Sequence, residues 1–327
     1  MEKLTTEKRA AILRCLIEGS SVASTTRITG TCKEAILKLL ADAGEACSEY
    51  QSEKMVNLPC KLLQMDELHS FVGCHEKNKA GAVNEHPGDV WTWTSLCADT
   101  KIIPSWRVGD RSARTAYDYC ADLCTRFSGR LQITTDGAAP YKWAILDCFG
   151  AVDYAMLVKI YGKDEAGNDA VIGISKRTIK GQPDADKIST SYIERSNLTV
   201  RMSNRRYTRR TNAFSKKLEN HCHMLAVTFM SYNFCRKHLT LGTAPAVEAG
   251  VSDKIMRMEE VVEIIDGYCQ RKTNAAFEAA FAARMTAPRT GPTTHEPVKL
   301  TPWYLDARSG GPNPPAWQRK PGIKYQD

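Results

Sequence analysis

The sequence predicts an α/β fold, with a mixed sheet flanked by helices, preceded by a small all-α unit. Between residues 61 and 252, segments rich in β-branched and aromatic residues alternate with segments of helical pattern. Near the N-terminus, apolar residues recur at helical spacing instead. The 327 residues, 43% hydrophobic and 25% charged, have the composition of a folded protein with two or three domains. The domain ranges that we expect are 1–46, 47–60, 61–252, 253–286 and 287–327.

Residues 1–46 are predicted to form a helix-turn-helix DNA-binding domain. One apolar helical stripe ends at Gly19, a short helix follows, and Gly30 marks a turn. Thr31 and Glu34 have the spacing of a capping box at the start of the next helix. Such domains place their second helix in the major groove, but small three-helix units that bind no DNA show the same pattern. The residues that we expect to contact DNA here are Arg27, Lys33 and Lys38.

The main domain, residues 61–252, is predicted to contain a five-stranded sheet. Three strands, a helix, a strand, a helix and a strand follow one another, and further helices close the domain. The polar residues 162–187 are predicted to form a loop. The predicted strands are residues 62–73, 90–100, 101–108, 131–136 and 152–162. The predicted helices are residues 111–127, 139–148, 189–201 and 214–236.

Two further segments differ from their neighbours in composition. Residues 47–60 are mostly polar and contain Pro59, which suits a linker between the first two domains. Within the C-terminal helices, residues 275–285 have a helical pattern. The tail, residues 287–327, carries eight of the chain's 14 prolines, and a segment of this composition buries too little apolar surface to fold alone. We expect the tail to be irregular or to dock onto a partner.

Positive charge is concentrated in one segment of the chain. The 45 Lys and Arg residues exceed the 37 Asp and Glu residues by only eight. Between Arg195 and Lys217, however, there are eight basic residues and no acidic one. A block of this kind indicates a polyanionic partner. The alternative is a solvated helix face, although solvated faces usually interleave both signs.

Three acidic residues stand out by their positions. Asp66 lies inside the first strand, Asp136 ends the fourth strand, and Glu194 lies on a helix just before the basic block. An acid in an apolar strand is costly unless it is paired, protonated or bound to a metal. Three carboxylates that meet would suit two Mg²⁺ ions, which Mn²⁺ could replace. Taken singly, each acid could instead be a cap, a turn residue or an ion-pair partner.

Several segments resemble the DDE transposases of bacterial insertion sequences, closest to the insertion sequence 1 family. The resemblance covers residues 60–252 and implies a ribonuclease H-like fold. It also implies that Asp66, Asp136 and Glu194 are the catalytic and metal-binding residues. The segments that carry it are MDELHSFVG, WTWTSLCADTK, TTDG, YIERSNLTVRMSNRRYTRRTNAFSK and MSYNFCRKHLTLGTAPAVEAGV. The family often has a zinc-binding cysteine cluster near the N-terminus, whereas this sequence has no CxxC pair.

The resemblance implies a transposase that binds the terminal inverted repeats of its own element. Water would cut each end to free a 3′-hydroxyl, and that hydroxyl would attack target DNA. The implied partners are double-stranded DNA and at least one further copy of the chain, because two ends must be joined. Arg201 lies two helical turns after Glu194, on the same face, and Asn197 would support the site. The other residues expected to contact DNA are Arg195, Arg205, Arg206, Arg209, Arg210, Lys216 and Lys217.

Other classes of function compete with this interpretation. A nuclease of the same fold would cut DNA without strand transfer, and a domesticated regulator would bind DNA with its acids idle. A small-molecule enzyme is disfavoured, since there is no Gly-rich phosphate loop or nucleophile elbow. We also expect no membrane span and no secretion signal. The 12 cysteines are therefore expected to be reduced thiols in a bacterial cytoplasm.

Overall fold

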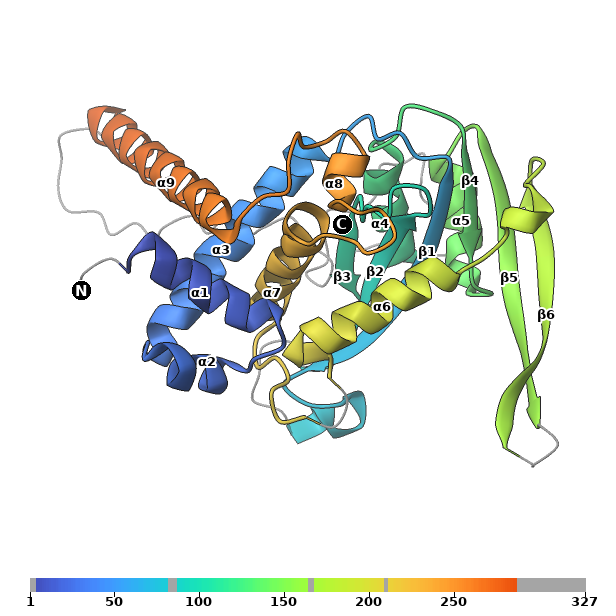
Figure 1. Ribbon diagram of the computed structural model, residues 1–327, viewed down its shortest axis with the longest axis horizontal. Helices are drawn as coiled ribbons and strands as arrows, with labels where there is room; N and C mark the ends of the chain where they lie inside the picture. The colour runs from blue at the N-terminus through green and yellow to red at the C-terminus, as the bar shows by residue number, and fades with distance from the viewer. Residues whose placement is uncertain (1–3, 82–86, 164–167, 209–210, 287–327) are drawn as a thin grey trace.

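The protein has an α/β structure in which helices flank a mixed six-stranded sheet (Figure 1). The computed structural model describes residues 4–81, 87–163, 168–208 and 211–286. The strands are β1 (Leu62–Val72), β2 (Gly88–Cys97), β3 (Trp106–Gly109), β4 (Leu131–Thr135), β5 (Val152–Lys163) and β6 (Asp169–Lys180).

Across the sheet the strands follow the order β3-β2-β1-β4-β5-β6. The pairs β3–β2 and β2–β1 are antiparallel, β4 and β5 run parallel to β1, and β6 returns antiparallel to β5. Met65 of β1 pairs with Thr135, the last residue of β4. The next residues along the two strands, Asp66 and Asp136, are therefore brought side by side.

The sixth strand corrects two predictions. We expected five strands and a loop over residues 162–187, whereas β6 occupies 12 residues within that range and pairs with β5. β6 lies at the sheet edge, and its apolar residues Val171, Ile172 and Ile174 are exposed. Because neither face of the strand is consistently buried, its sequence lacks the alternation that identifies a half-buried strand. Figure 1 shows β5 and β6 as a long hairpin that extends from the body.

Two helix pairs cover the two faces of the sheet. On one face, α4 (Ala113–Cys124) packs on α5 (Ala139–Cys148), and Tyr141 of α5 contacts the buried Trp93 of β2 edge to face. On the other face lie α6 (Ser191–Ser203) and α7 (Leu218–Met230). The Gln64 side chain of β1 accepts hydrogen bonds from the first amides of α6. Side chains two residues apart on a strand share a face, so Asp66 also faces α6.

Three N-terminal helices, α1 (Thr6–Ile17), α2 (Val22–Thr29) and α3 (Lys33–Lys54), precede the sheet. The α3 helix is longer than predicted, so residues 47–54, expected in a linker, are helical. The capping box was also wrong: Cys32 is the N-cap of α3 without a side-chain hydrogen bond, and the Thr31 hydroxyl is buried with no hydrogen-bond partner in the described part of the chain.

The N-terminal helices pack directly against the rest of the protein. α3 lies along both α7 and the long C-terminal helix α9 (Met258–Thr286), which includes the predicted helix 275–285. The Arg9 guanidinium of α1 forms a bidentate ion pair with Asp266 of α9, at 2.7 and 2.8 Å. One hydrophobic core runs from α1 through α7 into the sheet. The helices and the sheet therefore form one continuous body.

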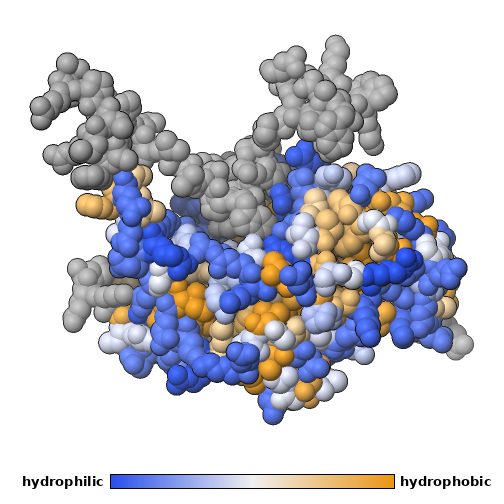
Figure 2. Space-filling view, turned by 90° about the horizontal axis from the view of Figure 1, so that it is seen from above, coloured by the Kyte–Doolittle hydropathy of each residue, from blue (hydrophilic) through white to orange (hydrophobic). Residues whose placement is uncertain are grey.

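The remaining described segments are short. A π-helical turn, Ser231–Cys235, extends α7, and α8 (Pro245–Glu248) follows it. The 12 cysteines are free thiols. The predicted irregular tail, residues 287–327, lies outside the described residues. Across the described part of the chain, no helix combines the length and the apolar character that a membrane crossing needs. On the face seen in Figure 2, hydrophobic patches lie among hydrophilic residues.

The contact between α3 and α7 leads to a stability prediction. A Cβ atom on the buried Gly44 would overlap the backbone and Cβ of His223, so one helix would have to move. We expect Gly44→Ala to lower the free energy of unfolding by about 1–3 kcal/mol, measured by urea denaturation.

The matched control is Gly267→Ala in α9, where an added Cβ would meet only the Arg271 guanidinium, at 3.6 Å. This change should be neutral or stabilise the helix by up to about 1 kcal/mol. Equal stability of the wild type and Gly44→Ala would mean that α3 and α7 do not pack this closely.

Candidate functional site

Asp66 is anchored on β1 by two hydrogen bonds. Its Oδ1 accepts from the Glu67 amide at 2.9 Å, and its Oδ2 accepts from the Asn197 side-chain amide of α6 at 2.8 Å. Asn197 is buried and Asp66 is partly buried. The carboxylate is therefore held in one orientation between the sheet and α6.

Asp136 lies directly after β4, at the point where the chain leaves the sheet for α5. Its Oδ1 accepts a hydrogen bond from the Ala138 amide at 2.9 Å, which fixes the turn. One carboxylate oxygen from each of Asp66, Glu67 and Asp136 can be chosen so that the three lie within 4.8 Å of one another. Such a cluster can hold a divalent cation, since hard cations prefer oxygen ligands.

The sequence analysis missed Glu67 as a member of this cluster. Its side chain is only 1% exposed, and its Oε2 accepts a hydrogen bond from Arg111 at 3.2 Å. Its Oε1 is buried and has no hydrogen-bond partner in the described part of the chain. A second acid inside an apolar strand was the available signal. Because neighbouring residues of a strand point to opposite faces, the pattern alone does not place Glu67 beside Asp66.

Burial and the repulsion between neighbouring carboxylates raise the pKa values of Asp66 and Glu67, so both side chains keep their protons to a higher pH than usual. Burial, and then the Asp136 charge, raise the pKa of Asp66 to about 6. The same two causes raise the pKa of Glu67 to about 7, although Arg111 opposes them. A bound cation would favour the ionised carboxylates and release these protons.

Glu194 lies on α6, one helical turn before Asn197. Its Oε1 accepts hydrogen bonds from Lys159 of β5 and from the Thr190 hydroxyl, both at 2.6 Å. Burial would raise its pKa, but the Lys159 and Thr190 contacts outweigh burial and lower it. Glu194 therefore ionises more readily than Asp66 or Glu67, and a cation would compete with Lys159 for it.

One open cavity of about 540 Å³ joins several of the predicted residues. Asp66, Glu194, Asn197 and Arg201 all line it, and Glu67 joins them. Asp136 does not line this cavity but lies in the carboxylate cluster with Asp66 and Glu67. The structure thus brings two of the predicted acids together in the cluster and places the third beside Asp66 in the cavity.

The predicted DNA contacts fall into separate places. Arg195 is exposed on α6, and Lys38 is engaged by Asp42 in an exposed ion pair of 3.0 Å. Arg209 and Arg210 lie outside the described residues. The remaining six line a second, larger cavity, of about 1220 Å³, and are Arg27, Lys33, Arg205, Arg206, Lys216 and Lys217.

Comparison with known proteins adds no family or relative to these observations. No protein-family model matches the chain, and no curated protein matches its sequence.

Proposed function

We propose that this protein is a DDE-type DNA transposase. The observation that carries the proposal is the meeting of Asp66 and Asp136, from adjacent parallel strands, beside the helix that bears Glu194. Asn197 links that helix to Asp66 by a hydrogen bond of 2.8 Å. These are the three acids and the asparagine that the resemblance to insertion sequence 1 transposases implies.

The strand order is compatible with the ribonuclease H-like fold that such enzymes have. β1 to β3 form an antiparallel unit, and β4 and β5 extend it in parallel with β1. The first acid lies on β1, the second follows β4 and the third lies on a later helix. β6 adds a sixth strand at the outer edge of this arrangement. The helix-turn-helix assignment of α1 to α3 is part of the same proposal.

The donor set fits two Mg²⁺ or Mn²⁺ ions, because carboxylate oxygens are the ligands that these cations prefer. Asp66, Asp136 and Glu194 would hold the ions, and Glu67 is within reach of the first two. When bound, the ions supply activation of the attacking oxygen and stabilisation of the leaving oxygen of a phosphodiester.

The protein's own residues would orient the reactants. Asn197 donates to one oxygen of Asp66 and so fixes the direction of the carboxylate. Arg201 borders the cavity beside Asp66 and Glu194, where it would hold a phosphate of the DNA. Water attack would break the bond between phosphorus and the 3′-oxygen of the element end. The freed 3′-hydroxyl would then attack a target phosphodiester, forming a new P–O bond while the target strand's own P–O3′ bond breaks and its 3′-hydroxyl leaves. The exchange needs no covalent bond between protein and DNA.

A cleavage and strand-transfer assay tests the proposal. Labelled DNA from the ends flanking the gene would be incubated with the protein and Mg²⁺ or Mn²⁺. We expect wild type to yield joined products and Asp66→Asn to yield none, because an amide cannot replace an anionic ligand. Glu248→Gln, an exposed carboxylate on α8, is the matched control and should retain activity.

The products also separate the competing functions. Cuts without joined products would favour a nuclease of the same fold. DNA binding with no chemistry, in both metals and with DNA ends of different lengths, would favour a regulator. Full activity of Asp66→Asn would remove the carboxylate cluster from the mechanism.

A further inference from the structure

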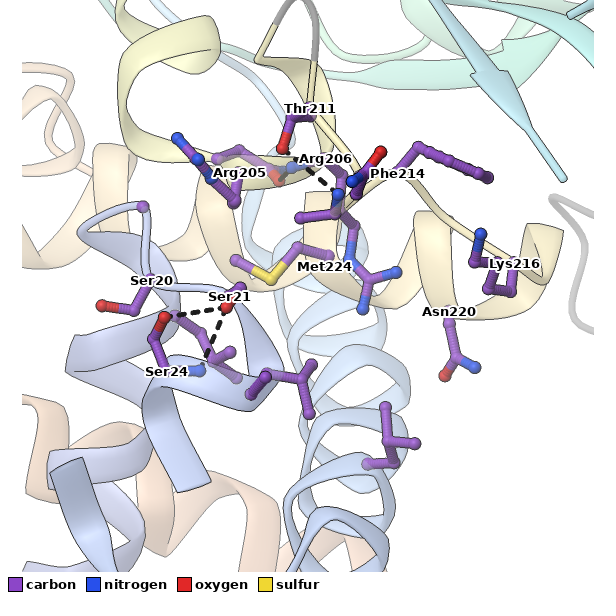
Figure 3. Close-up of a pocket in the computed structure, with 18 of the residues that line it drawn as sticks. Ser20, Ser21, Ser24, Arg205, Arg206, Thr211, Phe214, Lys216, Asn220 and Met224 are labelled. Carbon is purple, nitrogen blue, oxygen red and sulfur yellow. Dashed lines mark hydrogen bonds between the residues drawn. The ribbon is translucent and has the colours of Figure 1, made fainter. Parts of the chain in front are cut away.

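The larger cavity lies between the N-terminal helices and the segment that follows α6 (Figure 3). One wall comes from α2 and the start of α3, and includes Ser21, Ser24 and Arg27. The opposite wall comes from residues 204–206, 211–214, 216 and 217, with Asn220 and Met224 of α7 beneath it. Figure 3 shows Ser21 and Ser24 across the cavity from Arg205 and Arg206. Segments about 180 residues apart in sequence therefore share one cleft, which we call the basic cleft.

The basic cleft carries positive charge that acids do not balance. Among the described residues that line it, six are Lys or Arg and none is Asp or Glu. Within the described part of the chain, none of the six forms an ion pair with an acidic side chain. Clustered like charges repel one another, so this arrangement becomes favourable when an anion is bound.

Arg206 is the partly buried cation of the basic cleft. Its guanidinium donates to the Ser215 hydroxyl at 3.1 Å, a neutral partner. Burial lowers the pKa of Arg206 to about 10, so the side chain stays positively charged at neutral pH. A buried charge without a counter-ion is costly, and an anion in the basic cleft would supply that counter-ion.

The uncharged polar groups of the basic cleft also suit phosphate oxygens. Thr211, Asn212 and Asn220 add hydroxyl and amide donors to its walls. The N-terminus of α2 is partly satisfied, because Ser21 accepts from the Ser24 amide at 3.0 Å. The donors available to a phosphate therefore come mainly from side chains on the two walls rather than from the backbone amides at the start of α2.

The two walls are held in place before any ligand binds. Gly19, in the turn between α1 and α2, lies against the Met202 carbonyl of α6, where an added Cβ would be 3.0 Å from that oxygen. On the other wall, the Asn204 amide donates to Thr228 of α7 at 3.2 Å. Ser215 hydrogen-bonds to the buried His221, at 2.9 Å. A preformed site loses less conformational entropy on binding.

We propose that the basic cleft binds the sugar-phosphate backbone of double-stranded DNA, so that the N-terminal helices and the sheet body contact one DNA segment together. The choice of DNA rests on the proposed function. A volume of about 1220 Å³, with cations on both walls, exceeds what one phosphate needs. Phe214 is the one aromatic side chain among the described lining residues, whereas single-stranded sites stack bases on several aromatic rings.

The proposal changes the expected role of the N-terminal unit. Lys33, at the start of α3, belongs to the basic cleft, whereas Lys38 lies farther along α3 and is paired with Asp42. DNA held there would contact the first turn of α3 and the opposite wall, residues 204–206, 211–214, 216 and 217, at the same time. The N-terminal helices would then bind as one wall of a composite site.

The test measures binding of the full-length protein to a fluorescent duplex of about 30 base pairs, without divalent metal. Arg27→Gln and Lys216→Gln each remove one exposed cation, from opposite walls. Each lost phosphate contact should reduce the slope of the logarithm of the association constant against the logarithm of the salt concentration by about 0.9 in magnitude. At about 0.1 M salt, binding should be about eightfold weaker. The double variant should show about twice the slope change.

The charge-matched control is Lys54→Gln with Lys61→Gln, at the far end of α3 and before β1. This pair should bind nearly as wild type does. Equal losses in the control and cleft variants would overturn the proposal, because net charge alone would then account for binding. A loss on one wall only would overturn the composite site. Stronger competition by single-stranded DNA, RNA or an acidic protein than by duplex would overturn the assigned ligand.

The outcomes also separate this inference from the transposase proposal. If the cleft variants bind as wild type does while wild type still cuts and joins DNA, the basic cleft inference fails and the transposase proposal stands. If the variants lose binding as expected while wild type makes no products, the transposase proposal fails and the basic cleft stands.

Discussion

Glu194→Gln is expected to reduce strand cleavage by about a thousandfold with little change in DNA affinity. An amide keeps the size of the side chain but loses the negative charge that a cation requires. Metal catalysis contributes several kcal/mol, and each 1.4 kcal/mol is a factor of ten in rate. Cleavage of a labelled DNA end at saturating protein would give the rate, and fluorescence anisotropy would give the affinity.

Lys159→Gln is the informative partner of this variant. The Lys159 ammonium lies 2.6 Å from the Glu194 carboxylate, where it competes with any cation that Glu194 would bind. Without it, we expect the Mn²⁺ concentration that gives half-maximal cleavage to fall severalfold. If Glu194→Gln left cleavage unchanged, the carboxylate would serve only as the ion-pair partner of Lys159. A requirement for more Mn²⁺ in Lys159→Gln would contradict the competition.

The strands with one or two buried faces were predicted from the sequence, because burial leaves a continuous or alternating apolar pattern. The strand β6, which lacks such a pattern, was missed. β1, β2, β4 and β5 carry continuous or alternating buried residues for much of their length. β6 is an exposed edge strand, so pairing with β5 defines it more than burial does. Because most residues of β6 are exposed or half-buried, its sequence carries no burial pattern that distinguishes the strand from a polar loop.

The end of α3 was missed for a different reason. Residues 47–54 have the polar composition of a linker, yet Ser48 and Gln51 are buried. The Gln51 side-chain amide donates to the Ala226 carbonyl of α7 at 3.1 Å. A polar residue can thus belong to a helix interface when its hydrogen bonds are satisfied there, and composition alone does not reveal that partner.

Three residues of the candidate site were expected from the sequence, whereas Glu67 and the contacts among the side chains were not. The resemblance identified Asp66, Asp136 and Glu194, and the β1–β4 pairing brings the first two together. Glu67 lies on the face of β1 opposite to the one that carries Asp66. It joins the cluster because Asp136 lies beyond the end of β4, where it is not confined to one face of the sheet. The contact of Glu194 with Lys159 depends on β5 and was also not visible in the sequence.

Mn²⁺ is expected to stabilise the protein strongly at pH 7.5 and much less at pH 5. A ligand at one hundred times its dissociation constant adds about 2.7 kcal/mol to stability, which corresponds to a rise in Tm of about 4–5 °C for a protein of this size. The raised pKa values of about 6 for Asp66 and about 7 for Glu67 mean that protons occupy the cluster at pH 5. Protons and cations then compete for the same oxygens.

Without metal, the same groups should make the protein less stable as pH rises. The unfolded chain loses these protons near pH 4, whereas the folded protein holds them until about pH 6 to 7. Between those values the folded state binds more protons, so the contribution of the cluster to stability falls with increasing pH. Mn²⁺ should reverse that loss above about pH 6.

Thermal unfolding of wild type and Asp136→Asn, each with and without Mn²⁺ at both pH values, tests this coupling. The Asp136→Asn protein should lose the Mn²⁺-dependent rise in Tm. It should also be less sensitive to pH in the absence of metal, because the charge that repels Asp66 and Glu67 is gone. Glu248→Gln should behave as wild type does. A rise in Tm that survives in Asp136→Asn, or that is equal at pH 5 and pH 7.5, would place the Mn²⁺ outside the carboxylate cluster.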